Sequence, residues 1–230
     1  MTTDVKRFTS RYAFPSTEVL GEGMYLGAGA DLEVDTLLYA YSHGFFPWYE
    51  EEPILWCSPP LRMVLRAGEI HINRTMRKVL RRSAHTLSKD RAFREVIRQC
   101  AQTRSETWIT PEMEQAYIRL HELGWAHSWE TWDGGKLVGG LYGVVLNRVA
   151  FLESTFHLEN NAGKEAFVFM YNDLVAEGVR LAVVAIQAAA RCAEYEQVRC
   201  PVVVHVRGDD ADTRGLRGGD EPGRGRDVGG

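Results

Sequence analysis

Residues 126–156 read AHSWETWDGGKLVGGLYGVVLNRVAFLESTF, and this stretch decides the fold class. Apolar and polar side chains tend to alternate along three runs, which is the period of a half-buried β-strand. Asp-Gly-Gly separates the first two runs at residues 133–135, and Asn-Arg separates the last two at residues 147–148. Short turns of this composition connect antiparallel neighbours. We therefore expect an antiparallel meander of three strands.

Helices and further strands surround the meander in the sequence. Cap residues, Pro at a first helical position and Gly after the last one mark helix ends, and an apolar stripe marks the buried face. The clearest helix follows the cap residue Thr110, begins at Pro111 and ends at Gly124. The other expected elements are strands at 61–65 and 179–186 and helices at 74–82, 91–102 and 159–178.

This order of elements indicates an α+β fold with a mainly antiparallel sheet, similar to the acetyltransferase-like (GNAT) arrangement. Residues 1–60 are rich in loops, with one short helix expected within 31–44, and we expect them to form a small N-terminal domain. The GNAT-like domain then covers residues 61–206. Residues 207–230 are rich in Gly, Arg and acidic residues, and we expect a disordered tail because they have little apolar surface to bury.

Composition excludes several classes of protein. The chain has 230 residues, 45% of them hydrophobic and 25% charged, with a net charge of −4. A nucleic-acid contact must therefore come from a local patch of charge. We expect no signal peptide and no membrane span, because no apolar run approaches the ~18 residues that a span needs. The four cysteines form no C-x-x-C pair, so we expect a cytoplasmic protein with no metal site and no disulfide framework.

Residues 41–60, YSHGFFPWYEEEPILWCSPP, combine many aromatic residues, three glutamates and several prolines. The segment shows neither a helical nor a strand period. We interpret it as an ordered loop that presents aromatic rings to a ligand.

The helix expected at residues 74–82 carries a concentrated positive charge. Its sequence, RTMRKVLRR, contains no acidic residue. Met76, Val79 and Leu80 make an apolar stripe, and residues one turn apart on the remaining surface lie close together. The cationic residues are Arg74, Arg77, Lys78, Arg81 and Arg82. Such a surface favours sequence-independent contact with phosphates, although a solvated helix face has the same composition.

Generic catalytic motifs do not settle the chemistry. The sequence has no G-x-S-x-G and no H-E-x-x-H, and the Gly-rich residues 27–30 do not have the spacing of a nucleotide-binding loop. The helix after the meander begins ENNAGK at residues 159–164, without the Arg/Gln-x-x-Gly-x-Gly/Ala turn that binds coenzyme A in ordinary members of the GNAT-like fold. An acyl-CoA donor is therefore disfavoured.

Five motifs together give a specific resemblance. They are FPW at 46–48, ILWCSPP at 54–60, TWITP at 107–111, HELGWAHS at 121–128 and LVGGLYG at 137–143. In this order and spacing they resemble the leucyl/phenylalanyl-tRNA–protein transferases, over about residues 14–181. The resemblance implies transfer of Leu or Phe from aminoacyl-tRNA to the α-amino group of proteins that begin with Lys or Arg, which marks them for degradation. It implies no metal or nucleotide cofactor.

The resemblance also implies roles for particular residues. Trp48 and Trp108 match tryptophans associated with the 3′ adenosine of the tRNA, and the basic helix matches the tRNA-contacting surface. Glu153 matches a glutamate near the acceptor amine and is a candidate catalytic residue. The walls of the amino-acid pocket would be Leu141, Ala150, Ser154 and Met170.

The chain departs from the family after the last helix. The family has a strand ending L-I-D-x-Q and then H-x-x-S-L-G, whereas Val183 and Ala185 stand at the Asp and Gln positions here. Gln187 replaces the glutamine only with a two-residue slip, so residues 182–206 are divergent, through a shifted reading frame or a different terminus. We therefore expect weak or absent transfer. The alternatives are a non-catalytic tRNA-binding protein or an acyltransferase with another donor.

Overall fold

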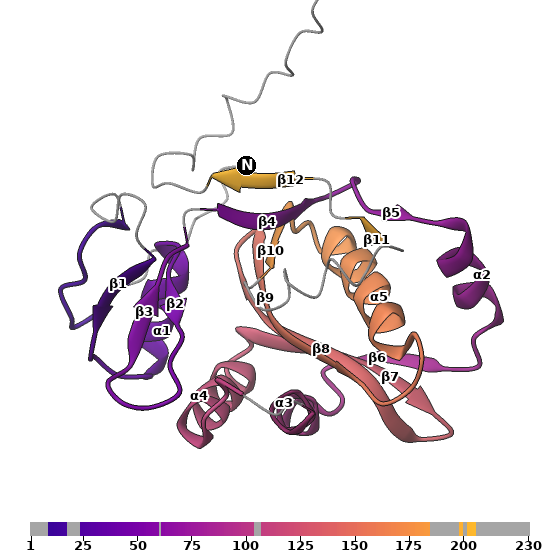
Figure 1. Ribbon diagram of the computed structural model, residues 1–230, viewed down its shortest axis with the longest axis horizontal. Helices are drawn as coiled ribbons and strands as arrows, with labels where there is room; N and C mark the ends of the chain where they lie inside the picture. Colours follow the sequence, from indigo (N-terminus) through magenta and orange to yellow (C-terminus); the bar gives the residue numbers. More distant parts are fainter. Residues whose placement is uncertain are drawn as a thin grey trace, which may run out of the picture.

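The centre of the protein is a seven-stranded sheet (Figure 1). The computed structural model describes residues 9–17, 24–59, 61–103, 107–184, 198–199 and 202–205. In spatial order the strands are β12 (Val202–His205), β4 (Leu61–Arg66), β10 (Leu181–Val184), β9 (Val149–His157), β8 (Lys136–Leu146), β7 (Ala126–Asp133) and β6 (Thr86–Lys89). All neighbouring strands are antiparallel except β9 and β10. The expected α+β class with a mainly antiparallel sheet is therefore confirmed.

The three-stranded meander is the part of the sheet that the sequence predicted most closely. The turn between β7 and β8 consists of Gly134 and Gly135, with φ angles of 52° and 91°. Asn147, in the turn between β8 and β9, also has a positive φ, of 54°. Gly and Asn adopt this left-handed region at the least cost, which is why these residues identify the hairpins in the sequence.

Helices cover both faces of the sheet. The helix α5 (Ala162–Ala176) packs on one face, and α3 (Phe93–Gln102) and α4 (Pro111–Glu122) pack on the other (Figure 1). Side chains of β8 alternate between two apolar clusters, with Tyr142 on the α3–α4 side and Leu141 on the α5 side. Gly139 lets α5 approach closely, since a Cβ there would lie 2.7 Å from the Ala162 carbonyl carbon.

Two helix starts have the caps that the sequence indicated. Thr110 Oγ1 accepts a hydrogen bond from the backbone N–H of Met113 at 3.2 Å, at the start of α4. The basic helix α2 (Arg74–Arg82) begins after Asn73, whose side chain accepts from the N–H of Met76 at 2.8 Å. Each cap satisfies a backbone donor that has no partner within the helix.

The basic helix lies against α5. Its residue Met76 is fully buried and contacts the cluster that contains Val168. At the end of α2, Ser83 donates a hydrogen bond to the buried carboxylate of Glu165 on α5, at 2.7 Å. The expected stripe is confirmed, and the helix is held at both its middle and its end.

The N-terminal residues form a second, smaller sheet with the order β1-β3-β2. Its strands are β1 (Tyr25–Ala28), β3 (Leu55–Cys57) and β2 (Phe46–Pro47). Beside it lies α1 (Val34–Ser42), whose N-cap residue Glu33 makes no side-chain hydrogen bond to the helix. Asp31 instead accepts a hydrogen bond from Thr36 Oγ1 at 2.7 Å and stabilises the first turn from outside.

The interpretation of residues 41–60 as a loop that presents its rings was wrong in two respects. The segment supplies β2 and β3, which are too short to show a strand period. Most of its rings are in the core: Phe45 and Trp56 are each 1% exposed and pack against each other and Phe14. Trp48 keeps a partly exposed position.

Several short strands had no signal in the sequence. They include β6, β12 and the pair β5 (His71–Ile72) and β11 (Val198–Arg199). The expected strand at 179–186 is present as β10. The tail expected at residues 207–230, and Gln187, lie outside the described residues. Among the helices that the structure describes, none combines the length and apolar composition needed to cross a bilayer.

Candidate functional site

A β-bulge places Glu153 at the centre of the candidate site. Tyr142 of β8 pairs with Ser154 of β9, and the next residue, Gly143, pairs with Leu152, so Glu153 is the extra residue of β9. A Cβ on Gly143 would lie 2.5 Å from the carbonyl oxygen of Phe151, so the bulge needs a glycine there. Bulges turn side chains out of their regular direction and are frequent beside active sites.

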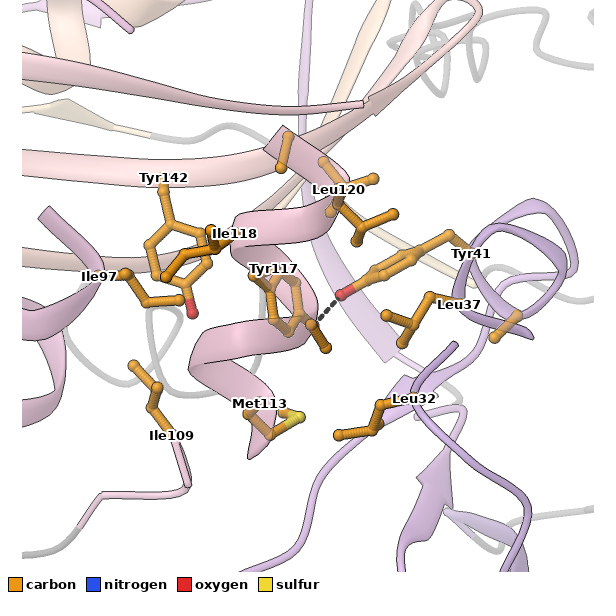
Figure 2. Packing of buried hydrophobic residues seen from close by; sticks show 14 of the residues in the cluster. Leu32, Leu37, Tyr41, Ile97, Ile109, Met113, Tyr117, Ile118, Leu120 and Tyr142 are labelled. Carbon is orange, nitrogen blue, oxygen red and sulfur yellow. Dashed lines mark hydrogen bonds between the residues drawn. The ribbon is translucent and has the colours of Figure 1, made fainter. Parts of the chain in front are cut away.

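The side chain of Glu153 meets two tyrosines from other elements. The hydroxyl of Tyr41, on α1, donates a hydrogen bond to Glu153 Oε1 at 2.8 Å. The hydroxyls of Tyr41 and Tyr117, on α4, are hydrogen-bonded to each other, as the dashed line in Figure 2 shows. All three side chains are buried, with Glu153 only 3% exposed. The contact joins the N-terminal part of the chain to the large sheet.

A narrow pocket lies against this cluster, where β10 ends. Its volume is about 10 Å³, close to the least that holds one water molecule. The pairing of β10 with β9 ends at Val184 and Leu152, one residue before Glu153. The lining residues are Tyr41, Phe46, Pro59, Arg62, Phe151, Leu152, Glu153, Val183 and Val184. The described residues therefore leave a small polar opening in an apolar wall.

Arg62 of β4 supplies the positive charge of this pocket. It is 5% exposed, and its Nη2 donates to the carbonyl oxygen of Gly44 and, at 3.4 Å, to Ser58 Oγ. Its guanidinium carbon lies 5.3 Å from the centre of the Phe46 ring. Its Nε and Glu153 Oε2 are both buried without a hydrogen-bond partner among the described residues. A donor and an acceptor are thus both uncommitted at one pocket.

Burial sets the protonation of these groups. It raises the pKa of the Glu153 carboxyl from 4.5 to about 7, against the opposing effects of the Tyr41 hydrogen bond and the Arg62 charge. It also lowers the pKa of Arg62 to about 10, despite the nearby Glu153. A buried charge loses its hydration, and here that loss exceeds the attraction between the two groups. Glu153 can therefore accept and release a proton near neutral pH.

The structure brings the segments that carry Trp48 and Trp108 together. Tyr49 Oη and Thr110 Oγ1, close to the two tryptophans in sequence, are 3.5 Å apart. Both indoles belong to the same apolar region, but Trp108 is 5% exposed whereas Trp48 is half-buried. In this arrangement only Trp48 has ring surface available for a nucleoside.

Most residues expected to line the amino-acid pocket lie on the opposite face of the sheet from the side chain of Glu153. Leu141, Ala150 and Met170 are buried in the cluster under α5, and Ser154 is 3% exposed. Glu153 points to the opposite side, toward α1 and α4. None of these four residues lines the pocket beside Glu153. The second expected catalytic residue, Gln187, lies outside the described part of the chain.

The expected RNA-binding cations are all exposed on α2. Within the described residues, none of them forms a salt bridge with a carboxylate. On α3, by contrast, Arg94 and Arg98 are paired with Glu122 and Glu114. Helix α2 and the small N-terminal sheet lie at opposite ends of the long axis of the molecule (Figure 1). Only an extended ligand can contact both α2 and the segment of Trp48.

Sequence reasoning missed three residues of the site: Tyr41, Arg62 and Tyr117. The two tyrosines lie on the buried faces of α1 and α4, but nothing in a helical period indicates what a buried hydroxyl will contact. Arg62 did leave a signal, because it has the same strand facing as the buried Val64. A charged residue at a buried strand position is rare without a partner or a function. Among the described residues, no three His, Cys, Asp or Glu side chains are grouped as metal ligands would be.

Comparison with known proteins gives a consistent family. The model of the leucyl/phenylalanyl-tRNA protein transferase family matches residues 64–191, and that of its N-terminal domain matches residues 30–60. A leucyl/phenylalanyl-tRNA–protein transferase of Syntrophobacter fumaroxidans is 46% identical over 182 residues, covering 77% of this chain and 78% of the relative. One of Chromobacterium violaceum is 48% identical over 160 residues, covering 68% of this chain and 69% of the relative.

Solved structures overlap with this chain only loosely. An aminoglycoside acetyltransferase from an uncultured soil sample is 13% identical, with a TM-score of 0.39 over 48% of this chain and 84% of that chain. A predicted acetyltransferase of Clostridium acetobutylicum, solved with acetyl-CoA, is 6% identical, with a TM-score of 0.39 over 49% of this chain and 88% of that chain. Overlaps of this size do not bear on function.

Proposed function

The chain belongs to the leucyl/phenylalanyl-tRNA–protein transferase family, and from this premise we propose how its site carries out the transfer. It is an aminoacyltransferase whose substrates are an aminoacyl-tRNA and a protein. We propose that the aminoacyl group is Leu or Phe and that the acceptor is the α-amino group of a protein beginning with Lys or Arg. The protein would act in the cytoplasm, without contact with a membrane, and mark its acceptors for degradation.

The observation that carries the proposal is the buried carboxyl of Glu153 with one oxygen free. An α-ammonium group has a pKa of about 7.7–8.0 in water and must lose a proton before it can attack an ester. Burial raises the pKa of Glu153 to about 7, so its carboxylate can take that proton at neutral pH. Tyr41 holds the other oxygen and fixes the direction of the free one.

The chemical step is an aminolysis. The neutral amine attacks the carbonyl carbon of the aminoacyl ester, a new C–N amide bond forms, and the bond from that carbon to the ribose oxygen breaks. The ammonium group gives its first proton to Glu153 before the attack. The attacking nitrogen then gives up a second proton, which the leaving ribose oxygen takes up to become a hydroxyl. The tRNA ester is already activated, so positioning of the two reactants supplies much of the acceleration.

We propose that the tRNA binds along the molecule from α2 to the N-terminal sheet. The unpaired cations of α2 suit phosphates, and Trp48 suits the terminal adenine because bases stack on aromatic faces. The proposed domains are residues 1–60, which present Trp48 and Tyr41, and residues 61–206, which carry Glu153 and α2. Since α2 and the N-terminal sheet lie at opposite ends of the molecule, each would contact a different portion of the RNA.

The amino-acid pocket is proposed to open from the cluster that contains Leu141, Ala150 and Met170. The cluster is apolar, as a pocket for Leu or Phe must be. Ser154 is buried as well, whereas Trp108 belongs to the apolar cluster on the other face of the sheet. Because they are buried, we infer that binding of the charged tRNA end requires side-chain movement.

A transfer assay tests the proposal. Phe-tRNA labelled in the amino acid is mixed with a peptide beginning with Arg and with a matched peptide beginning with Glu. Incorporation into the Arg peptide alone supports the proposal, and a rate that falls ~10²–10⁴-fold in Glu153→Gln supports the role of the carboxylate. Salt-sensitive tRNA binding without incorporation would contradict catalysis and favour a non-catalytic tRNA-binding protein. Val183 in place of an acidic residue leads us to expect a slow wild-type rate.

A further inference from the structure

Two buried ionisable groups, Glu153 and Arg62, line one pocket, and the proposed transfer reaction uses only Glu153. Arg62 lies on β4 and is tied to the carbonyl oxygen of Gly44 and to Ser58 Oγ. These contacts come from the loops that follow α1 and β3, so they fix the guanidinium independently of Glu153. Its partners are neutral, and within the described residues it forms no salt bridge with any carboxylate.

A buried arginine with only neutral partners requires an explanation. Burial of a charge is costly unless another charge compensates it, and an arginine that only filled space would be replaced by an apolar residue at little cost. The charges around Arg62 and Glu153 are few: Tyr41 and Tyr117 are neutral because burial raises their pKa well above 10, and Cys57 is neutral for the same reason. The facing residues of β10 are valines.

Resting on the proposed function, we propose that Arg62 is a positioning residue of the transfer reaction, whose fixed positive charge keeps the carboxyl of Glu153 ionised opposite the incoming amine. The two groups line the same pocket without touching, and each has a polar atom without a partner. The pocket holds about one water molecule, so an amine and an ester carbonyl would enter it as its side chains move aside. A direct ion pair would occupy both groups, whereas this arrangement leaves the carboxylate oxygen free.

The test measures the pKa of the Glu153 carboxyl directly. Protein labelled with ¹³C at the glutamate carboxyls is titrated by NMR, and the signal absent from Glu153→Gln identifies the residue. We expect a midpoint near pH 7 in the wild type and a rise of about one pH unit in Arg62→Met, because an opposite charge nearby lowers a carboxyl pKa by roughly 1–3 units. The ionised fraction at pH 7 then falls about fivefold. Arg62→Lys should restore much of the wild-type midpoint.

Arg66→Met is the matched control, because it makes the same change at the other end of β4, outside the pocket. Its titration and transfer rate should equal those of the wild type. An unchanged midpoint in Arg62→Met, or a rise that Arg62→Lys does not reverse, would overturn the proposal. Where the Met variant does not fold, Arg62→Gln takes its place, since the amide still donates to the Gly44 carbonyl and the same criterion applies.

The titration needs no tRNA, so it separates this inference from the proposed function. A wild type that titrates as expected but transfers nothing contradicts the function and leaves the electrostatic role supported. Where transfer is measurable, the apparent pKa of the acidic limb of the pH–rate profile should rise by the same amount in Arg62→Met. Equal loss of rate at every pH would contradict a role through the protonation of Glu153.

Discussion

Replacing Glu153 by Gln should make the protein more stable, by an amount that grows between about pH 4.5 and 7 and is largest above pH 7. Glu153 has a pKa of about 7 in the folded protein against an ordinary 4.5, so the folded state binds a proton that the unfolded state has lost between these values. The protonated, uncharged carboxyl favours folding. Its contribution is complete below about pH 4.5 and is lost as the pH rises through 7. Gln remains uncharged at every pH and accepts the Tyr41 hydrogen bond with its amide oxygen.

The size of the effect follows from the two pKa values. A pKa unit corresponds to about 1.4 kcal/mol, so the difference between 4.5 and about 7 gives about 3 kcal/mol in the free energy of unfolding. Glu153 is completely buried, so solvent screening does not reduce this value. The attraction of Arg62 is already included in this value, because it lowers the pKa of Glu153 against the effect of burial. The melting temperature at pH 8.5 should rise by roughly 6–12 °C, at 2–4 °C per kcal/mol.

Urea unfolding of wild type and variant at a series of pH values from 4.5 to 8.5 measures the difference. The free energies of unfolding of the two proteins should be nearly equal at the lowest pH, and that of the variant should exceed the wild-type value increasingly as the pH rises. Glu51→Gln serves as the control, because that glutamate is exposed and should give a constant, small difference. A stability difference for Glu153→Gln that does not change with pH would refute the argument that a buried charge is being removed.

Other features give sharper tests of single contacts. Gly143→Ala should lower the free energy of unfolding in urea by ~1–3 kcal/mol, because the new Cβ would clash with a strand carbonyl. Gly27→Ala, with open space around it, should change little. Equal effects would contradict a bulge that needs glycine. Arg81→Gln should weaken tRNA binding and lower by about one the slope of the logarithm of affinity against the logarithm of salt concentration. Arg94→Gln, whose arginine is paired with a glutamate on α4, should change neither. Equal effects of the two variants would contradict a role of α2 in the interface. Trp48→Ala should weaken binding of charged tRNA by ~1–3 kcal/mol beyond its effect on uncharged, 3′-truncated tRNA, and equal losses would mean general misfolding.

The parts of the fold that local rules determine were predictable from the sequence. The meander is determined by alternation and by Gly and Asn in its turns, and α4 by Thr110 and Pro111. These signals act over a few residues, so one sequence contains them in full. The small N-terminal sheet was not predictable in this way, because β2 has two residues and β3 has three. Its aromatic rings are buried by contacts with distant residues such as Phe14.

The candidate site was predictable only where a motif carried it. Glu153 was found through a resemblance, but its direction depends on a bulge that neither strand sequence announces. Tyr41 and Tyr117 are 76 residues apart, and only the packing of α1 against α4 brings their hydroxyls together (Figure 2). The buried cation Arg62 had a local signal, an arginine with the facing of Val64, which gains meaning only when its pocket is known.

The valine at position 183, where the family resemblance places an aspartate, affects the protonation of Glu153. Val183 lines the pocket beside Glu153, at the position where the family resemblance places an aspartate. A second carboxylate there would add a negative charge next to Glu153, and one of two adjacent carboxyls is forced to remain protonated. With valine, the described lining has one carboxylate and one guanidinium, so the pocket is neutral when both are charged. The apolar wall also increases the loss of hydration that raises the pKa of Glu153. In our proposal the proton-accepting role therefore falls on Glu153, and the same burial that raises its pKa to about 7 makes its charge costly to the fold.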